Sequence, residues 1–571
     1  MGTELPIQPS TLLKYQYQKI QNLNIETRLL FLEPGSPNDP LQGSIYHSVH
    51  LHGQSYEAVS YTWGNPNALA SSPLLLNDRT LSITCNVETM LRELRHPHQR
   101  CVFWIDAVCI DQDDLNERAL HVRIMRKIYT RATRVIVWIG ESDSESREAL
   151  QGLAVLSNHG SFDSDGVEAS LNSHSSLEDM IQYAGTHSNV LNQIIALLDR
   201  HWFHRLWIVQ EVVVSKEVAI KCGAEWLDWK SFSNALAVLV LLHSSPKSRF
   251  RGDLPLLRAL KIDRHRRLEN QHRSINGLVH DYRDNMATDP RDKIYALYGL
   301  ANDSPHFPEP NYLDSITNIY VQFAMTVMQR HNSLFLLHAI TSFELSGGSA
   351  DLSLPSWVPD WRHPWSDNIL FKDVLEQATI ENGYQYYSVA RPPRISGVES
   401  ETEIPMVRHV LIDNSRIATT IQISSEWRIL SIYGLCWSEV ASVVPIDVEN
   451  IAQSVDWFLD AYDRVNSTVT GNTILVTLGF AKQQDEMTTS LLRGRAFVRL
   501  KNGSRGLGSS CNIQEGDIVC FLHDQGVPFV LRKTGENYRL IGQFLTGSVL
   551  DGKVGSLLET SSCKVEWFSV Q

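Results

Sequence analysis

Two short, continuously apolar runs constrain the fold of this chain more than any other feature: CVFWI at 101–105 and RVIVWIG at 134–140. Apolar residues that do not alternate with polar ones are typical of strands buried on both faces of a parallel sheet. The segment between the runs carries apolar residues at helical spacing, namely Leu115, Ala119, Val122, Met125 and Tyr129. This order predicts a right-handed βαβ unit, with strands 101–106 and 134–139 adjacent, parallel and central in an open sheet.

The rest of the chain divides by its residue pattern, because 571 residues are too many for one core. Residues 142–195 are rich in Ser, Asp and His and are expected as a long surface insertion, whereas β-type runs punctuated by turns begin near 494. We expect five parts: an N-terminal lead-in (1–45), an α/β domain with the polar insertion (46–240), a helical region (241–345), a mixed α/β linker region (346–490) and a C-terminal antiparallel β domain (491–571).

The composition excludes several classes of partner. A net charge of −13, from 51 basic and 64 acidic residues, argues against a nucleic-acid partner. The eight cysteines include no C-x-x-C pair, so we expect reduced thiols and no metal site. The longest apolar run, 235–242, is too short to span a membrane, and MGTELPIQPS is not a secretory signal. We therefore expect a cytoplasmic protein.

Common catalytic motifs are missing from the chain. There is no Walker phosphate loop, H-E-x-x-H or G-x-S-x-G, and GLGSSC at 506–511 departs from the dinucleotide fingerprint at its sixth position. These absences disfavour kinases, Rossmann oxidoreductases, zincins and α/β-hydrolases. They also predict no bound cofactor.

A series of segments in fixed order resembles one known family. The core segments are YEAVSYTWG (56–64), FWIDAVCIDQDDLNER (103–118), MRKIYTRATRVIVWIGE (125–141) and HWFHRLWIVQEV (201–212). The later segments are CGAEWLDW (222–229), DPRDKIYALYGLA (289–301), LPSWVPDW (354–361) and GDIVCFLHDQGVPFVLR (516–532). They are similar to the heterokaryon-incompatibility (HET) domain proteins of filamentous fungi. Two positions depart from the family pattern, with Asp111 where Asn is usual and His121 where Gln is usual.

The resemblance implies a fold and a role. HET domains trigger self/non-self recognition and programmed cell death, and they look like distant relatives of TIR domains, some of which cleave NAD. It therefore implies a TIR-like open parallel sheet flanked by helices. TIR enzymes carry a catalytic glutamate in a W-x-x-x-E pattern, and Trp207 and Glu211 have that spacing here. Glu211 is accordingly the candidate catalytic residue, with NAD as a substrate rather than a cofactor.

The residues around Glu211 leave two interpretations open. A single helix is expected over DRHWFHRLWIVQEVVVS, in which Glu211 flanks the apolar face beside Trp207. Ile208, Val209 and Val212 make the rest of this helix apolar as well, so it is expected to be buried between layers. An ionised carboxylate there is costly unless it is paired. Glu211 is therefore either a functional carboxylate, with Trp207 lining a ribose pocket, or half of a buried ion pair with Arg205, Arg118 or another arginine.

Further substrate-binding candidates follow the predicted strands. Asp106 and Asp111 come at or just after the end of strand 101–106, the edge where open α/β sheets bind ligands. They could hold ribose hydroxyls or a metal, or Asp111, Asp113 or Asp114 could cap the next helix. Tyr61 and Trp63 end an earlier strand and could stack on a base or pack in the core. The full candidate set for substrate binding is Tyr61, Trp63, Asp106, Asp111, Arg118 and Trp207.

Three classes of function are consistent with these features. The first is a death-inducing signalling domain that cleaves NAD-type nucleotides through Glu211. The second is a non-enzymatic domain that signals by assembling with an incompatibility partner protein or with itself. The third is a metal-dependent nuclease using Asp106, Asp111 and Glu211, which lacks a histidine ligand at a recognisable spacing.

Overall fold

The structure is a computed structural model. It describes residues 13–20, 26–49, 54–65, 67–70, 72–163, 168–245, 247–248, 250, 253–268, 273–331, 336–337, 354–363, 421–423, 429–446, 495–508, 512–522, 528–545 and 564–571. These residues belong to two compact units. The first extends to Pro305 and includes Glu309–Tyr312, and the second comprises His306–Pro308 and the described residues from Leu313 onward.

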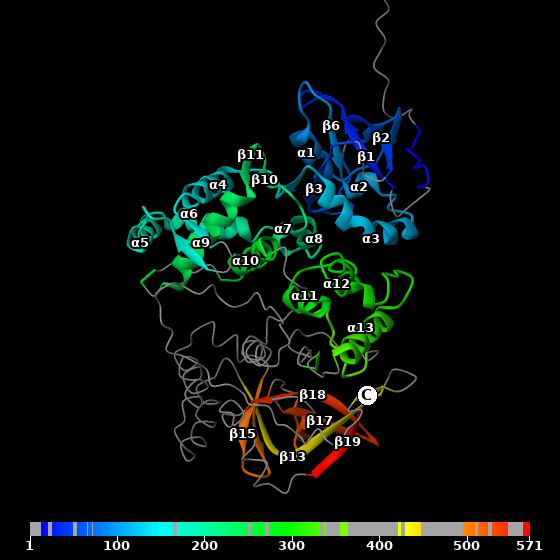
Figure 1. The fold of residues 1–571 in the computed structure, drawn as a ribbon, viewed down its shortest axis with the longest axis vertical. Coiled ribbons are helices and arrows are strands. Elements are labelled where there is room, and N and C mark those ends of the chain that lie inside the picture. The colour runs from blue at the N-terminus through cyan, green and yellow to red at the C-terminus, as the bar shows by residue number, and fades with distance from the viewer. Residues whose placement is uncertain are drawn as a thin grey trace, which may run out of the picture. The chain divides into compact units, whose positions relative to one another are not determined.

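A nine-stranded mixed sheet forms the core of the first unit (Figure 1). Its strands are, in spatial order, β11 (Glu225–Asp228), β10 (Val218–Cys222), β7 (Arg134–Trp138), β3 (Glu57–Tyr61), β6 (Cys101–Trp104), β1 (Glu26–Leu32), β2 (Gln42–Val49), β4 (Leu74–Leu76) and β5 (Arg79–Leu81). The four strands from β10 to β6 are parallel, whereas β11 and β1 are antiparallel to their neighbours. The expected α/β class with flanking helices is confirmed, but the sheet is mixed rather than wholly parallel.

The prediction that strands 101–106 and 134–139 are adjacent is wrong. Both are parallel and interior, but β3 lies between β6 and β7 and pairs with each. EAVSY of β3 is itself almost continuously buried, so it too is suited to an interior position in the sheet. Continuous apolarity therefore indicated burial correctly but could not indicate which buried strands are neighbours.

The segment expected as a lead-in contributes to the same sheet. β1 pairs with β6 through Leu30 opposite Phe103, and β2 pairs with β1 along its length. Two helices connect β6 to β7, a short α2 (Asp106–Cys109) and a long α3 (Leu115–Arg131), and α1 (Cys85–Leu94) precedes β6. The predicted helix over 114–132 is thus confirmed as α3.

The polar segment 142–195, expected as a long surface insertion, forms helices and a hairpin. It contains α4 (Ser144–Leu156), the hairpin of β8 (Gly160–Phe162) and β9 (Ala169–Leu171), α5 (Leu177–Thr186) and α6 (Ser188–Leu198). A capping box at Asp143 and Ser146 begins α4, and leucines at helical spacing bury its inner face. The prediction relied on the average polarity of the segment and so missed the helical spacing of these leucines.

The helix expected over HWFHRLWIVQEVVVS is broken into two pieces. These are α7 (His201–His204) and α8 (Ile208–Val213), separated by Arg205, whose backbone is extended with φ −73° and ψ 143°. Leu206 donates its amide to Met286 O at 2.9 Å, so the break is held by pairing with a later segment. The helical elements that follow are α9 (Trp229–Ser244), α10 (Asp253–Arg267), α11 (Ile275–Asp281), α12 (Asp292–Tyr295), the 3-10 turn Ser304–His306 and, in the second unit, α13 (Ile316–His331).

The second unit contains an eight-stranded sheet, drawn from yellow to red in Figure 1. Its strands are β12 (Ile421–Ile423), β13 (Leu430–Pro445), β14 (Ala496–Leu500), β15 (Arg505–Gly508), β16 (Ile518–Leu522), β17 (Phe529–Thr534), β18 (Asn537–Leu545) and β19 (Lys564–Val570). All ladders are antiparallel except one bridge between β18 and β19. The expected C-terminal β domain therefore begins earlier, with β13 inside the region expected as mixed. The greater part of 346–490 lies outside the described residues.

Candidate functional site

The carboxyl ends of β3 and β6 bring together three of the predicted site residues, namely Tyr61, Trp63 and Asp106. The Tyr61 hydroxyl donates to Asp106 Oδ1 at 2.8 Å, and Trp63 Nε1 donates to Oδ2 at 2.7 Å. The chain turns from β6 directly into α2, so the Ala107 amide also donates to Oδ1, at 2.7 Å. Tyr61 is buried whereas Trp63 is 38% exposed, so Asp106 lies between the core and the surface at the sheet edge where ligands bind.

Glu211 lies on α8, all six residues of which are buried. The helix contacts β3, α3 and α10, and Glu211 itself is 3% exposed, which agrees with the expected position between layers. Within the described part of the chain, Glu211 Oε2 has no hydrogen-bond partner and the carboxylate forms no ion pair. Burial raises the pKa of Glu211 to about 7, against the charge of Arg205 and a hydrogen bond with Ser60, while Asp106 raises it further.

Arg205 reaches the same place from the break between α7 and α8. One of its guanidinium nitrogens donates to the carbonyl oxygen of Tyr61, the last residue of β3. Asn285 Nδ2 donates to the carbonyls of Phe203 and Arg205 at 3.4 and 3.2 Å and so holds the extended backbone. The break between α7 and α8 therefore gives Arg205 an extended backbone, from which its side chain reaches the end of β3.

The electrostatics of two buried tyrosines agree with a shared neighbourhood for these charges. Burial, followed by the charge of Asp106, raises the pKa of Tyr61, and Arg205 opposes the shift. Burial, followed by the charges of Glu211 and Asp106, raises the pKa of Tyr129, and Arg205 again opposes it. We call Tyr61, Trp63, Asp106, Arg205 and Glu211 the β3-edge cluster. It combines two carboxylates, one guanidinium and two aromatic rings.

Trp207 and Arg118 lie at a second cluster, centred on Asp292. Trp207 Nε1 donates to Asp292 Oδ2 at 3.0 Å, and the Tyr312 hydroxyl donates to the other carboxylate oxygen. Burial raises the pKa of Asp292 to about 6, while hydrogen bonds from Tyr312 and Trp207 and the charge of Arg118 oppose the rise. Trp207 is the residue before α8, so this cluster fixes the start of the helix that carries Glu211.

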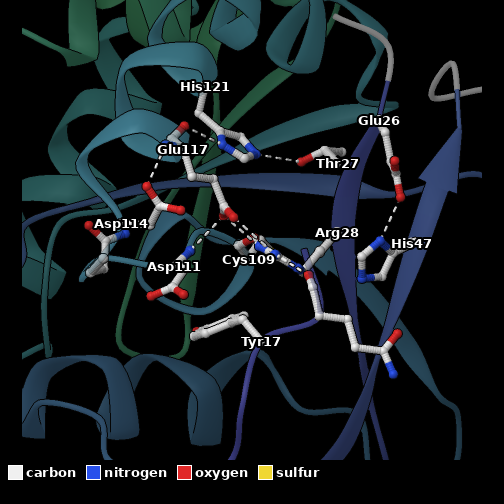
Figure 2. A network of polar contacts seen from close by, with 12 residues as sticks. Tyr17, Glu26, Thr27, Arg28, His47, Cys109, Asp111, Asp114, Glu117 and His121 are labelled. Atoms are coloured by element: carbon white, nitrogen blue, oxygen red, sulfur yellow. Dashed lines mark hydrogen bonds and ion pairs between the residues drawn. The ribbon is translucent and has the colours of Figure 1, made fainter. Parts of the chain in front are cut away.

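Asp111 belongs to a third group, a buried network that joins β1 to α3 (Figure 2). The Asp111 amide donates to Glu117 Oε1 at 2.8 Å, and the Asp111 carboxylate accepts from the Asp113 amide at 3.2 Å. Asp114 caps α3, as one of the alternatives for these acids predicted. No hydrogen bond or ion pair among the described residues joins Asp111 to the β3-edge cluster.

The ion pair at the centre of this network is Arg28 with Glu117. Arg28 Nη1 and Nη2 donate to the two Glu117 carboxylate oxygens at 2.5 and 3.0 Å, and Arg28 is fully buried. His121, at one of the positions that depart from the family pattern, contacts Glu117 O at 3.0 Å and Thr27 Oγ1 at 3.2 Å (Figure 2). Burial lowers the pKa of His121, so the ring is neutral near pH 7.

Sequence reasoning missed Arg205 as a site residue and missed Arg28, Asp292 and Ser60 altogether. Arg205 was expected only as an ion-pair partner on a continuous helix, because no residue in HWFHRLW is a helix breaker. The break depends on Met286 and Asn285, which are about 80 residues away in sequence. The pattern around Arg205 carries no local signal for it.

Metal ligation finds no support among the described side chains. Where residues are described, no group of three or more His, Cys, Asp and Glu is arranged to hold a metal ion. Asp106 and Glu211 share one cluster, but Asp111, the third acid of the nuclease hypothesis, contacts Glu117 instead.

Within the described ranges, no helix has the length and apolar character needed to cross a bilayer.

Comparison with known proteins identifies one family. Residues 56–211 match the model of the family described as heterokaryon incompatibility protein (HET), and Glu211 is the last residue matched. A relative from Neurospora crassa, heterokaryon incompatibility protein 6, OR allele, is 27% identical over 414 residues. That alignment covers 62% of this chain and 60% of the relative. No solved structure matches the chain significantly.

Proposed function

We propose, since residues 56–211 match the HET family, that this chain acts in heterokaryon incompatibility and causes cell death by cleaving NAD-type nucleotides with Glu211 as the catalytic residue. The family match and the Neurospora relative support the general role. The observation that carries the proposed chemistry is the unpaired Glu211 carboxylate. It is buried, has an oxygen without a hydrogen-bond partner in the described chain, and is close enough to Asp106 for that charge to raise its pKa.

A buried carboxylate oxygen without a hydrogen-bond partner is costly, and such groups concentrate at functional sites. A structural role would be better served by the ion pair with Arg205 or Arg118 that the sequence also allowed. Neither pair is formed among the described residues, although Arg205 is close enough for its charge to lower the pKa of Glu211. A ligand hydroxyl group would satisfy the free oxygen.

The reaction that this arrangement supports is hydrolysis of the bond between ribose C1′ and the nicotinamide nitrogen. The bonding electrons leave with nicotinamide, which departs neutral, and the ribose becomes an oxocarbenium-like cation. Ionised Glu211 would accept hydrogen bonds from the ribose hydroxyls and stabilise that cation. Water then adds to C1′ and releases one proton, so the products are ADP-ribose, nicotinamide and H⁺.

The remaining side chains of the β3-edge cluster would position the nucleotide. Asp106 Oδ1 already accepts from Tyr61 and Ala107, whereas Oδ2 accepts from Trp63 and keeps a lone pair, so Oδ2 would act as a second acceptor for a ribose hydroxyl. The exposed indole of Trp63 offers a face on which a base can stack. In the proposed site, Trp63 is exposed to solvent and Glu211 is buried.

Inducible expression of the chain in the cytoplasm of a host cell tests the proposal. The wild-type chain is expected to arrest growth and deplete cellular NAD, whereas Glu211→Gln keeps the shape of the side chain and should do neither. Glu217→Gln is the matched control, because Glu217 is exposed and lies shortly after α8. Cell death that persists in Glu211→Gln without loss of NAD would contradict cleavage and favour assembly with a partner protein.

A further inference from the structure

Arg205 is the one cation of the β3-edge cluster, and the proposed cleavage assigns it no role. It is partly exposed, which is unusual for a residue so close to a fully enclosed carboxylate. It forms no ion pair with Glu211 or Asp106 within the described residues, although its charge acts on Glu211, Tyr61 and Tyr129. Arg205 therefore does not neutralise Glu211 or Asp106 by direct contact, and its position requires another explanation.

The backbone around Arg205 is built to present the side chain in one position. The extended residue between α7 and α8 is held by Asn285 and by the pairing of Leu206 with Met286. The guanidinium is anchored at its far end by donation from Nη1 to Tyr61 O. With both ends fixed, the planar group loses little conformational entropy when it binds a ligand.

The guanidinium also keeps donors to spare. An arginine has five N–H groups, and the donation to Tyr61 O uses one of them. No nitrogen of Arg205 is a buried atom lacking a partner among the described residues, so the nitrogens that do not bond to Tyr61 O remain accessible to solvent. Paired N–H groups of a guanidinium match two oxygens of a phosphate in a planar, bidentate arrangement.

We propose that Arg205 binds the phosphate group of a ribonucleotide whose ribose lies against Glu211 and Asp106. The inference rests on the proposed function and assigns to Arg205 the phosphate of the nucleotide substrate. Trp63, the exposed ring of the same cluster, would stack on the base. Arg118, the basic residue expected from the sequence to bind substrate, lies at the Asp292 cluster instead.

Binding of two probes that differ only by one phosphate tests this proposal. Calorimetric titration of the full-length chain with AMP and with adenosine is the measurement, because neither probe contains the bond that is proposed to break. AMP is expected to bind at least about tenfold more tightly than adenosine, the size of effect typical of charged hydrogen bonds. Inorganic phosphate alone should compete with AMP only weakly, because it lacks the ribose and base.

Variants at Arg205 give the decisive comparison. Arg205→Gln should abolish the preference for AMP over adenosine, whereas Arg205→Lys should keep part of that preference. Arg147→Gln, an exposed arginine on α4, is the control and should bind both probes as the wild type does. The thermal midpoint of each variant shows whether it is folded. If Arg205→Gln melts early, the comparison is made with Arg205→Lys.

The outcomes separate this proposal from the proposed cleavage. Equal affinities of the wild-type chain for AMP and adenosine, or no detectable binding of AMP, would overturn the role of Arg205. An unchanged AMP preference in Arg205→Gln would overturn it as well. If AMP binding depends on Arg205 but no nicotinamide is released from NAD, the phosphate site stands and the cleavage fails.

Discussion

A single carboxyl group determines how the β3-edge cluster responds to pH. Glu211 is enclosed by α8, β3 and neighbouring helices, and burial raises its pKa to about 7. The folded state therefore binds a proton more tightly than the unfolded chain does. The contribution of Glu211 to the free energy of unfolding is greatest below its unfolded pKa of about 4.5 and is lost as the pH rises through about 7, because the folded state must then bury a charge.

This shift yields a prediction for Glu211→Gln. Above about pH 7.5 the variant should be more stable than the wild type by up to about 3 kcal/mol, because the neutral amide avoids the cost of a buried charge. Near pH 4 the difference should nearly disappear. Urea unfolding at the two pH values measures this, with Glu217→Gln as the exposed control. A loss of about 3–5 kcal/mol at high pH would instead reveal an ion pair that Glu211 completes.

At the scale of elements, the network in Figure 2 ties the first strand of the chain to the long crossover helix. Arg28 of β1 and Glu117 of α3 are both buried and paired through two hydrogen bonds. Cys109 O and Gln18 O accept further bonds from Arg28, at 3.1 and 2.6 Å. The pair therefore holds β1, the end of α2 and the start of α3 as one piece, next to the turn that follows Asp106.

Removing the negative charge from this pair should destabilise the first unit. Glu117→Gln leaves the buried Arg28 guanidinium without a counter-charge, which is expected to cost about 3–5 kcal/mol. Glu178→Gln is the matched control, because Glu178 and Lys247 are 75% and 74% exposed and their pair should contribute no more than about 1 kcal/mol. Denaturant midpoints compare the two. Equal, small losses in both variants would contradict the account of the network.

The elements also show where the sequence was and was not sufficient. Apolar periodicity correctly located α3, β6 and β7 and the burial of Glu211, because these features depend on local spacing. Strand order could not be predicted from local spacing, since nothing in the sequence of β3 indicates that it lies between β6 and β7. The break at Arg205 and the placement of Trp207 on Asp292 depend on contacts with residues about 80 to 85 positions away.

At the scale of the whole molecule, the proposed chemistry lies within one of the two units. All residues of the β3-edge cluster belong to the unit that contains the nine-stranded sheet. The second unit has its own core around Trp437 and Phe521, whose rings lie 5.4 Å apart. We expect this β-sheet unit to take no part in the cleavage, which remains a prediction.

The measurement that tests the central claim most directly is the release of nicotinamide from NAD by the purified full-length chain. At about pH 8, where Glu211 is mostly ionised, the wild type and Glu217→Gln should release nicotinamide and ADP-ribose in equal amounts. Glu211→Gln should remain folded and be slower by at least about 100-fold. Nicotinamide release that is no faster than in buffer, or that continues undiminished in Glu211→Gln, would contradict the account.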